Sequence, residues 1–266
     1  MIYPHPSFFL DKLIKSHDLI AIKAEFEAEG STLDELCVLS HLCALFESSL
    51  TVKVGGPSAQ RDFYESCELG AKLILVPMIE SARSLKRSFK IYSNCVSNYP
   101  KSFSSPKLAI NIESKEAVAM INSIVKVVED TDVALENVVV GRSDLSASYK
   151  INSVDDEFIT KLSANIVKIF SSLGINVTIG GSVTHQSYDS LRYLADLGAT
   201  AFETRKCTLS ISQLSSNAVF NRAVDQSLEF ERSWLFFKKS IYDSHNNIDS
   251  KRIQSLTKRL SSNNKS

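Results

Sequence analysis

Two acidic residues stand where carboxylates commonly bind metal ions. Glu113 closes the run LAINIE, and Asp144 follows the run VVVG after two intervening residues. Magnesium and manganese ions prefer oxygen ligands at about 2.1 Å and usually take one or two carboxylates from the protein. Neighbouring parallel strands place their ends side by side, so Glu113 and Asp144 can share one Mg²⁺ or Mn²⁺ ion. Singly, each residue suits the first turn of a helix, but the pair favours a metal site.

A second group of charged residues falls on the first two apolar runs. Lys23, Glu25 and Glu27 alternate along the first run and therefore share one face of a strand. Burying three charges on one face is costly, which favours a function; the alternative is a solvated strand end with an internal ion pair. Lys53 follows on the second run. A less favoured alternative is that Lys23 or Lys53 forms a Schiff base with a carbonyl substrate, as desolvated lysines can.

Further polar residues follow the later apolar runs. Arg142 precedes Asp144 and could bind an anionic group of a substrate. Glu203 and Arg205 end the last clear run; Arg205 could orient a substrate carboxylate or pair with Glu203. The glycines of residues 180–182 could expose backbone N–H groups to a phosphate, or could simply serve a tight turn.

The elements that must position these residues alternate in type along the chain. Seven short apolar runs predict strands, and amphipathic segments between them predict helices, one of which opens with a capping box at Thr32 and Glu35. Such alternation is typical of parallel strands joined by helices. Polar residues recur at the strands' carboxyl ends, which favours a (β/α)8 TIM barrel over a doubly wound sheet. The predicted strands are 20–26, 50–54, 72–78, 108–113, 137–141, 175–180 and 199–204.

The two ends of the chain are less regular. The eighth strand is not evident, and we expect it near Met1–Pro4 or missing. After Thr208 one long helix is predicted over about 210–244, with more aromatic surface than one barrel face needs, which suggests burial against a second subunit in a homo-oligomer. We therefore expect a single TIM-barrel domain over residues 1–244 and a polar, flexible tail over residues 245–266.

Composition excludes several classes of protein. Thirty basic and thirty acidic residues give a net charge of zero, which offers no electrostatic reason for binding nucleic acid or a membrane surface. No run approaches the ~20 apolar residues of a membrane span, and the N-terminus lacks a secretory signal pattern. Five scattered cysteines, an odd number without a CxxC pair, favour reduced thiols in a cytoplasmic protein.

Several segments together resemble the HpcH/HpaI aldolase and citrate lyase β-subunit family of the phosphoenolpyruvate/pyruvate barrel superfamily. They are LVPMIES, NIES and VVVGRSDLSAS. In that family one strand ends in a Pro-Met pair, matched by Pro77 and Met78, and another ends in a glutamate metal ligand, matched by Glu113. The next strand runs into G-x-x-D-L-S, matched by Gly141 and Asp144. The resemblance covers most of residues 10–206 in order and spacing.

The resemblance implies a carbon–carbon lyase of the aldolase or citrate lyase type. In the family Mg²⁺ or Mn²⁺ holds a keto acid such as pyruvate and stabilises its enolate, and the last helix is often exchanged between subunits. Two positions depart from the pattern: Ala28 stands where family aldolases carry a base histidine, and Lys53 stands in place of an arginine. Lys53 or Arg142 would then neutralise the enolate, and Glu27 or Glu25 would act as base. The alternative is a barrel that has lost catalysis and serves as a ligand-binding or assembly protein.

Overall fold

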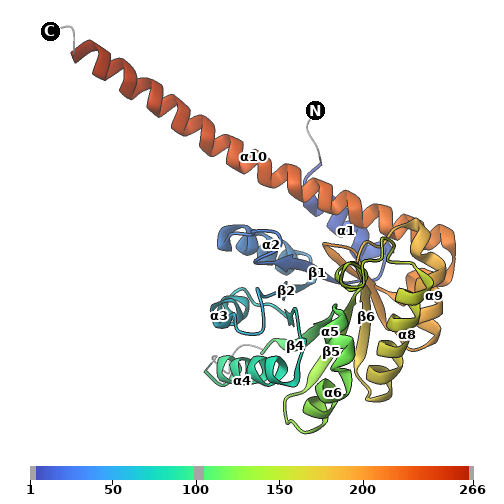
Figure 1. The fold of residues 1–266 in the computed structure, drawn as a ribbon. Coiled ribbons are helices and arrows are strands. Elements are labelled where there is room, and N and C mark those ends of the chain that lie inside the picture. Colours follow the sequence, from blue (N-terminus) through green and yellow to red (C-terminus); the bar gives the residue numbers. More distant parts are fainter. Residues whose placement is uncertain (1–3, 99–104, 264–266) are drawn as a thin grey trace.

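The computed structural model describes residues 4–98 and 105–263, which form a closed eight-stranded barrel wrapped by helices (Figure 1). Each of the first six strands pairs in parallel with the next, as the alternating pattern predicts. The TIM-barrel expectation is therefore confirmed. The strands are β1 (Leu19–Glu25), β2 (Ser49–Lys53), β3 (Leu73–Val76), β4 (Lys107–Ile112), β5 (Leu135–Gly141), β6 (Asn176–Gly180), β7 (Ala201–Glu203) and β8 (Cys207–Ser210).

The eighth strand corrects the prediction for the N-terminus. β8 follows β7 after a tight turn, in which the Thr204 N–H donates to the Cys207 carbonyl at 2.9 Å, and it runs antiparallel to both β7 and β1. Met1–Tyr3 lie outside the described residues, and a helix begins at Pro6. A four-residue strand without a crossover helix lacks the long spacing that marks the other seven, so the alternating pattern does not reveal it.

The helices begin and end close to the predicted segments. The capping box of the second helix is present, because Thr32 Oγ1 accepts from the Glu35 N–H and Glu35 Oε2 accepts from the Thr32 N–H, both at 3.3 Å. The α-helices are α1 (Pro6–Ser16), α2 (Leu33–Leu45), α3 (Gln60–Glu68), α4 (Ala82–Asn98), α5 (Lys115–Ala119), α6 (Ile121–Glu129), α7 (Arg142–Ser148), α8 (Glu157–Ser172), α9 (Tyr188–Asp196) and α10 (Asn217–Asn263), with 3₁₀ turns η1 (His185–Ser187) and η2 (Ile211–Ser215).

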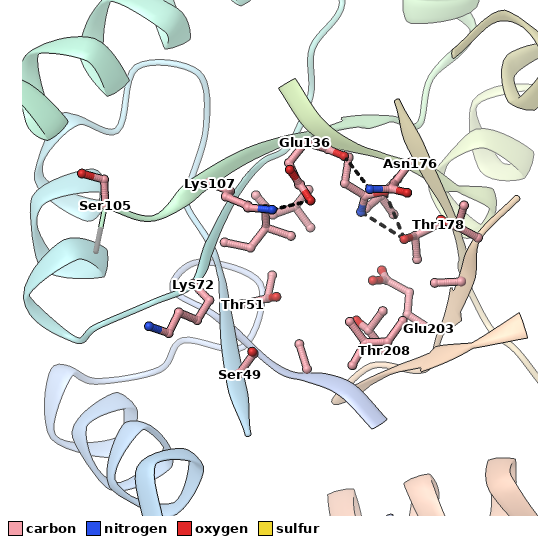
Figure 2. A pocket seen from close by; sticks show the side chains of 18 residues that line it. Ser49, Thr51, Lys72, Ser105, Lys107, Glu136, Asn176, Thr178, Glu203 and Thr208 are labelled. Atoms are coloured by element: carbon pink, nitrogen blue, oxygen red, sulfur yellow. Dashed lines mark hydrogen bonds and ion pairs between the residues drawn. The ribbon is translucent and has the colours of Figure 1, made fainter. Parts of the chain in front are cut away.

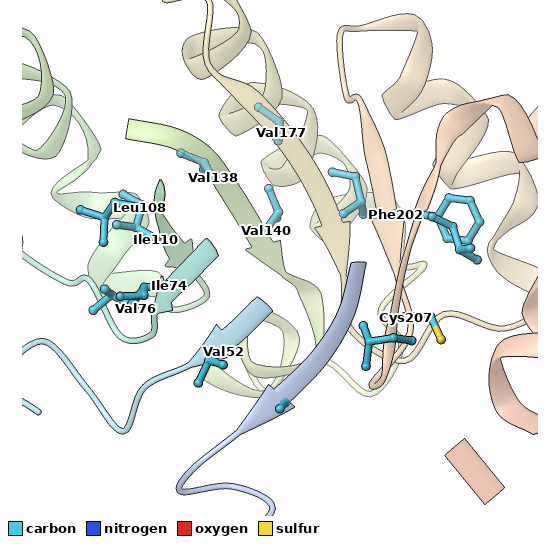
Figure 3. Close-up of a cluster of buried hydrophobic side chains, with 14 of the residues drawn as sticks. Val52, Ile74, Val76, Leu108, Ile110, Val138, Val140, Val177, Phe202 and Cys207 are labelled. Carbon is cyan, nitrogen blue, oxygen red and sulfur yellow. The ribbon is translucent and has the colours of Figure 1, made fainter. Parts of the chain in front are cut away.

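The main core lies between the strands and the surrounding helices (Figure 3). Alternate strand residues face it, including Ile74, Ile110, Val138 and Val140, all fully buried. Residues between them face the barrel axis, where only a small apolar cluster forms from Leu75, Ala109 and Val139, with Leu73 packed against it. The other axial positions are mostly polar or charged. The barrel interior is therefore unlike its exterior, and it holds the groups that could do chemistry.

The last helix is longer than predicted. α10 has 47 residues and continues beyond Ser244 to Asn263, a length of about 70 Å. Its first part packs along α1 and buries Phe220, Phe230 and Trp234, whereas the rest projects past the barrel (Figure 1). The boundary expected at residue 244 falls inside this helix. In the described part of the chain, no helix combines the length and the apolar character needed to cross a membrane.

Candidate functional site

A cavity of about 430 Å³ opens at the carboxyl ends of the strands. Six of the eight residues that the sequence singles out line it; they are Lys23, Glu25, Lys53, Glu113, Asp144 and Arg205. The remaining two, Glu27 and Arg142, are not among its lining residues. The carboxyl ends of barrel strands are the usual place for an active site.

Glu113 is the most tightly held carboxylate of the site. It directly follows β4, and its side chain is almost fully buried. Oε1 accepts a hydrogen bond from the Met78 N–H at 2.9 Å, and Oε2 accepts one from Asn111 Nδ2 at 2.7 Å. Gly141 lies so close that a Cβ there would come within 2.8 Å of Glu113 Oε2. This explains why the strand that leads to Asp144 ends in glycine.

Asp144 lies in the first turn of α7 and faces the same cavity. Burial raises the pKa of Glu113, and the charge of Asp144 raises it further. Lys53 and the hydrogen bonds from Met78 and Asn111 act in the opposite direction without reversing the shift. The two carboxylates therefore repel each other across a partly desolvated space, and a bound cation would relieve that repulsion.

The oxygen atoms around this space fit a hard divalent cation. Asn111 Oδ1 is buried and has no hydrogen-bond partner among the described residues, and Asn111 lines the cavity beside Glu113. In residues 4–98 and 105–263 no three His, Cys, Asp or Glu side chains cluster as metal ligands. A metal here would have two protein carboxylates, the number that Mg²⁺ commonly takes when water or substrate supplies its other ligands.

Two ion pairs fix the lysines of the cavity. Lys23 Nζ donates to Glu203 Oε1, and both side chains are more than nine-tenths buried. Lys53 Nζ lies 3.9 Å from Glu25 Oε2. Lys23 therefore pairs with the end of β7 rather than with a neighbour on its own strand, and Glu203 pairs with Lys23 rather than with Arg205. Lys53 is the lysine whose charge acts on Glu113.

The rim of the cavity contains residues that the sequence did not indicate. Glu231, on α10, lines the cavity together with Arg205. Burial raises the pKa of Glu231, the charges of Arg205 and Lys206 lower it, and Glu29 raises it. Lys206 is buried and forms an ion pair with Glu29, whose Oε1 has no partner among the described residues. The one visible signal was an acid inside the aromatic stretch FERSWLFF.

The structure does not bring Glu27 and Arg142 to the cavity. Glu27 is exposed, and its carboxylate lies against Gly55, at the side of β2. Arg142 is fully buried: Nη1 lies 2.8 Å from Asp155 Oδ1, and Nε donates to the Gly180 carbonyl at 3.1 Å. These contacts join α7 to the end of β6. The expected roles of Glu27 as base and Arg142 as anion-binding group are not supported by these positions.

The turn after β6 also bears on a phosphate-binding alternative. Gly181 has a φ of +91°, and a Cβ there would come within 2.4 Å of the Ser143 backbone nitrogen. Ser143 Oγ and Ser182 Oγ share a hydrogen bond at 2.8 Å. The turn packs closely on the start of α7, which accounts for its glycine without a bound phosphate.

Part of the chain matches a known protein family in sequence. Residues 38–178 match the family described as HpcH/HpaI aldolase/citrate lyase. No curated protein matches the chain in sequence.

Solved structures with the same fold include three proteins of low sequence identity. An HpcH/HpaI aldolase/citrate lyase family protein from Burkholderia cenocepacia J2315 has a TM-score of 0.57 at 14% identity, covering 79% of this chain and 84% of that one. The HpcH/HpaI aldolase from Desulfitobacterium hafniense DCB-2 has a TM-score of 0.58 at 15% identity, covering 75% and 80%. Citrate synthase SbnG has a TM-score of 0.57 at 17% identity, covering 86% and 89%. At these identities the likeness establishes the fold.

Proposed function

Because this chain belongs to the HpcH/HpaI aldolase/citrate lyase family, we propose that it is a divalent-metal-dependent carbon–carbon lyase acting on a keto acid such as pyruvate. Aldolases and citrate lyases, which give the family its name, cleave or form carbon–carbon bonds. The observation that carries the proposal is the pair Glu113 and Asp144, which share one cavity with Lys53. Burial and mutual repulsion raise the pKa of Glu113, as expected for a cation site without its cation.

In this proposal Glu113 and Asp144 would hold Mg²⁺ or Mn²⁺. When bound, the ion supplies a Lewis acid that polarises the substrate carbonyl. Met78 and Asn111 orient the Glu113 carboxylate through their hydrogen bonds. Lys53 supplies positive charge for the oxygen that becomes negative when the carbon–carbon bond breaks. Arg205, exposed at the rim, would bind the substrate carboxylate.

Two carboxyl groups of the cavity could move the proton. Glu25 stands at the end of β1 beside Lys53, and it is the one of the two expected bases that lines the cavity. Glu231 enters from α10, and its raised pKa brings it closer to the range of a general base at neutral pH. A comparison of Glu25→Gln, Glu231→Gln and Glu27→Gln in one assay assigns the role. We expect Glu27→Gln to match the wild type, because Glu27 lies outside the cavity.

The decisive experiment measures binding and chemistry separately. Thermal unfolding of the wild type with Mn²⁺ and oxalate, which mimics a pyruvate enolate, should show stabilisation that needs both; ligand at 100 times its dissociation constant adds about 2.7 kcal/mol. Glu113→Ala should abolish the shift. Glu116→Ala, an exposed acid on α5, is the matched control and should retain it. An equal shift in the wild type and Glu113→Ala would exclude the proposed site.

A second candidate function is ligand binding without catalysis. It is favoured by Ala28, which lines the cavity at the place where family aldolases carry the base histidine. Exchange of pyruvate methyl protons with deuterium, followed by NMR in the presence of Mn²⁺-loaded protein, reports proton removal directly. Exchange that is lost in Glu113→Ala supports the lyase. Metal-dependent oxalate binding without any exchange supports the binding protein.

We also propose that the protein is a homo-oligomer that associates through α10. Leu235 and Phe236 on this helix are more than half exposed although they adjoin the buried Trp234. Burying such side chains against a second copy would remove apolar surface from water. Light scattering should therefore give a mass above one chain, and Leu235→Ser should lower it. A monomeric wild type would contradict the proposal.

A further inference from the structure

A second cavity, larger than the first, occupies the opposite end of the barrel. Its volume is about 550 Å³, within the usual range for small-molecule sites. Residues at or just before the amino ends of the strands line its mouth, among them Ser49, Lys72, Lys107 and Asn176 (Figure 2). Nothing in the proposed reaction uses this space.

The cavity exists because the axial positions of this barrel are small. TIM barrels normally fill the axis with layers of branched apolar side chains. Here β1 contributes Ala21, β7 contributes Ala201, and β2, β6 and β8 contribute Thr51, Thr178 and Thr208. These side chains are too short to meet across the barrel, so the axis remains open from below.

The wall of the cavity is mainly apolar, with hydroxyl groups on part of it. Leu73, Leu75 and Val139 cover the side formed by β3 and β5. The threonines stand on β2, β6 and β8, and in Figure 2 the side chains of Thr51, Thr178 and Thr208 surround the open space. A ligand with hydrocarbon on one side and hydrogen-bonding groups on the other would match both parts of the wall.

Hydrogen-bonding capacity in the cavity is partly unused. Thr178 exchanges hydrogen bonds with Asn137, at 3.0 and 3.2 Å. By contrast, neither Thr51 Oγ1 nor Thr208 Oγ1 has a hydrogen-bond partner in the part of the chain that the structure describes, although both residues are buried. Neither hydroxyl oxygen is among the buried atoms without a partner, so both are open to the cavity and available to a bound molecule.

The inner end of the cavity is closed by Glu203. Its carboxylate points into the space in Figure 2. The residue also lines the first cavity, at the carboxyl ends of the strands, which we call the upper cavity. Lys23 already balances its charge through the buried ion pair, and at the mouth Lys107 is paired with Glu136 at 2.7 Å. A bound anion would be repelled by the Glu203 carboxylate, and a bound cation would compete with Lys23 for that carboxylate. An uncharged hydrogen-bond donor avoids both costs.

We propose that this lower cavity is a second binding site, for a small uncharged aliphatic diol or polyol. Its hydroxyl groups donate to Glu203 and exchange hydrogen bonds with Thr51 and Thr208. Its hydrocarbon side packs on Leu75 and Val139. The site is separate from the proposed metal site and does not depend on the lyase reaction.

Saturation-transfer NMR with glycerol, erythritol and 1,2-hexanediol tests the site directly. We expect transfer to 1,2-hexanediol in the wild type, and binding about tenfold weaker in Thr51→Val/Thr208→Val, which keeps the side-chain shape but removes two hydroxyl groups. Thr160→Val on α8 is the matched control and should bind like the wild type. Ala201→Leu, which fills the cavity, should also lose binding.

Two outcomes would overturn the proposal. One is the absence of saturation transfer to all three probes in the wild type. The other is equal transfer to the wild type, the double valine variant and Ala201→Leu, with circular dichroism showing all of them folded. Addition of Mn²⁺ and oxalate distinguishes the two cavities. The diol signal should persist in their presence, whereas displacement by oxalate would place the diol in the upper cavity and also overturn the proposal.

Discussion

The Met78 N–H donates to Glu113 Oε1 at 2.9 Å, so the backbone after β3 holds the carboxylate that ends β4. Met78 has a φ of +55°, a left-handed conformation that side chains other than glycine adopt at some cost. The strained backbone of Met78 thus helps to fix the position of the buried Glu113 carboxylate. Strain of this kind concentrates at functional sites, where the surrounding structure maintains it.

Glu113 should make stability depend on pH in the absence of metal. Its folded-state pKa is raised above the ordinary 4.5, so the folded protein binds this proton more tightly than the unfolded chain does. The contribution of Glu113 to the free energy of unfolding is complete when the pH is below the ordinary pKa of 4.5. It is lost as the pH rises through the raised pKa of the folded state. Urea unfolding of Glu113→Gln should show a flatter change in this window than the wild type. Parallel profiles would contradict the pKa shift.

Protonation of Glu113 should also compete with metal. The affinity for Mn²⁺ should fall as pH decreases through the raised pKa, since the carboxylate must lose its proton to bind the ion. Calorimetric titrations at a series of pH values from the ordinary 4.5 upward measure this. Affinity independent of pH would indicate that Glu113 is not a ligand.

Gly141→Ala should damage the site through its closest contact. A Cβ at this position would lie 2.7 Å from Glu113 Cβ and 2.8 Å from Glu113 Oε2, so the carboxylate must move. We expect a loss of about 1–3 kcal/mol in unfolding free energy and weaker Mn²⁺ binding. Gly56→Ala is the control, because a Cβ added there would meet no atom within 4 Å. Similar behaviour of the two variants would refute this interpretation.

Arg142 should be a structural residue. Removing its guanidinium in Arg142→Ala leaves Asp155 without its buried partner, and we expect a loss of about 3 kcal/mol in unfolding free energy. Arg61→Ala, which removes an arginine that is 84% exposed on α3, should cost much less. Denaturant unfolding measures both. If Arg142→Ala keeps full stability and instead weakens substrate binding, the role expected from the sequence is restored.

The Lys23–Glu203 pair should behave as a coupled unit. Lys23→Met leaves the Glu203 carboxylate buried without its cation and should cost about 3–5 kcal/mol near neutral pH. Lys23→Met/Glu203→Gln removes both charges and should recover much of that loss. A double-mutant cycle in urea gives the coupling energy. A coupling near zero would show that the two side chains are independently solvated.

The sequence predicts the elements whose signals are local. The strands that lead to Glu113 and Asp144 are apolar runs with polar ends, and the barrel follows from their regular spacing. The cavity lining also contains the predicted Lys23, Glu25 and Lys53. These features depend on short stretches of sequence and on the geometry of parallel strands.

The features that the sequence did not reveal depend on long-range contacts. Lys23 finds its partner 180 residues away, on β7. Glu231 reaches the cavity only because α10 packs on the barrel, and the aromatic residues around it pointed to a subunit interface. Arg142 stands between two motif residues, but its side chain turns toward Asp155. Neither the periodicity of apolar residues nor the spacing of motifs predicts which way a side chain points or which distant residue it contacts.

The reversed strand β8 decides which way the chain travels afterwards. Had the eighth strand run with the others, the chain would have emerged beside the upper cavity, and the closing helix would have descended away from it. Instead β8 returns the chain to the lower end of the barrel, so α10 runs from there toward the upper end. Glu231 lies 14 residues after Asn217, about 21 Å along this helix, and so reaches the rim of the upper cavity. One inverted four-residue segment thus gives the final helix access to the reaction space.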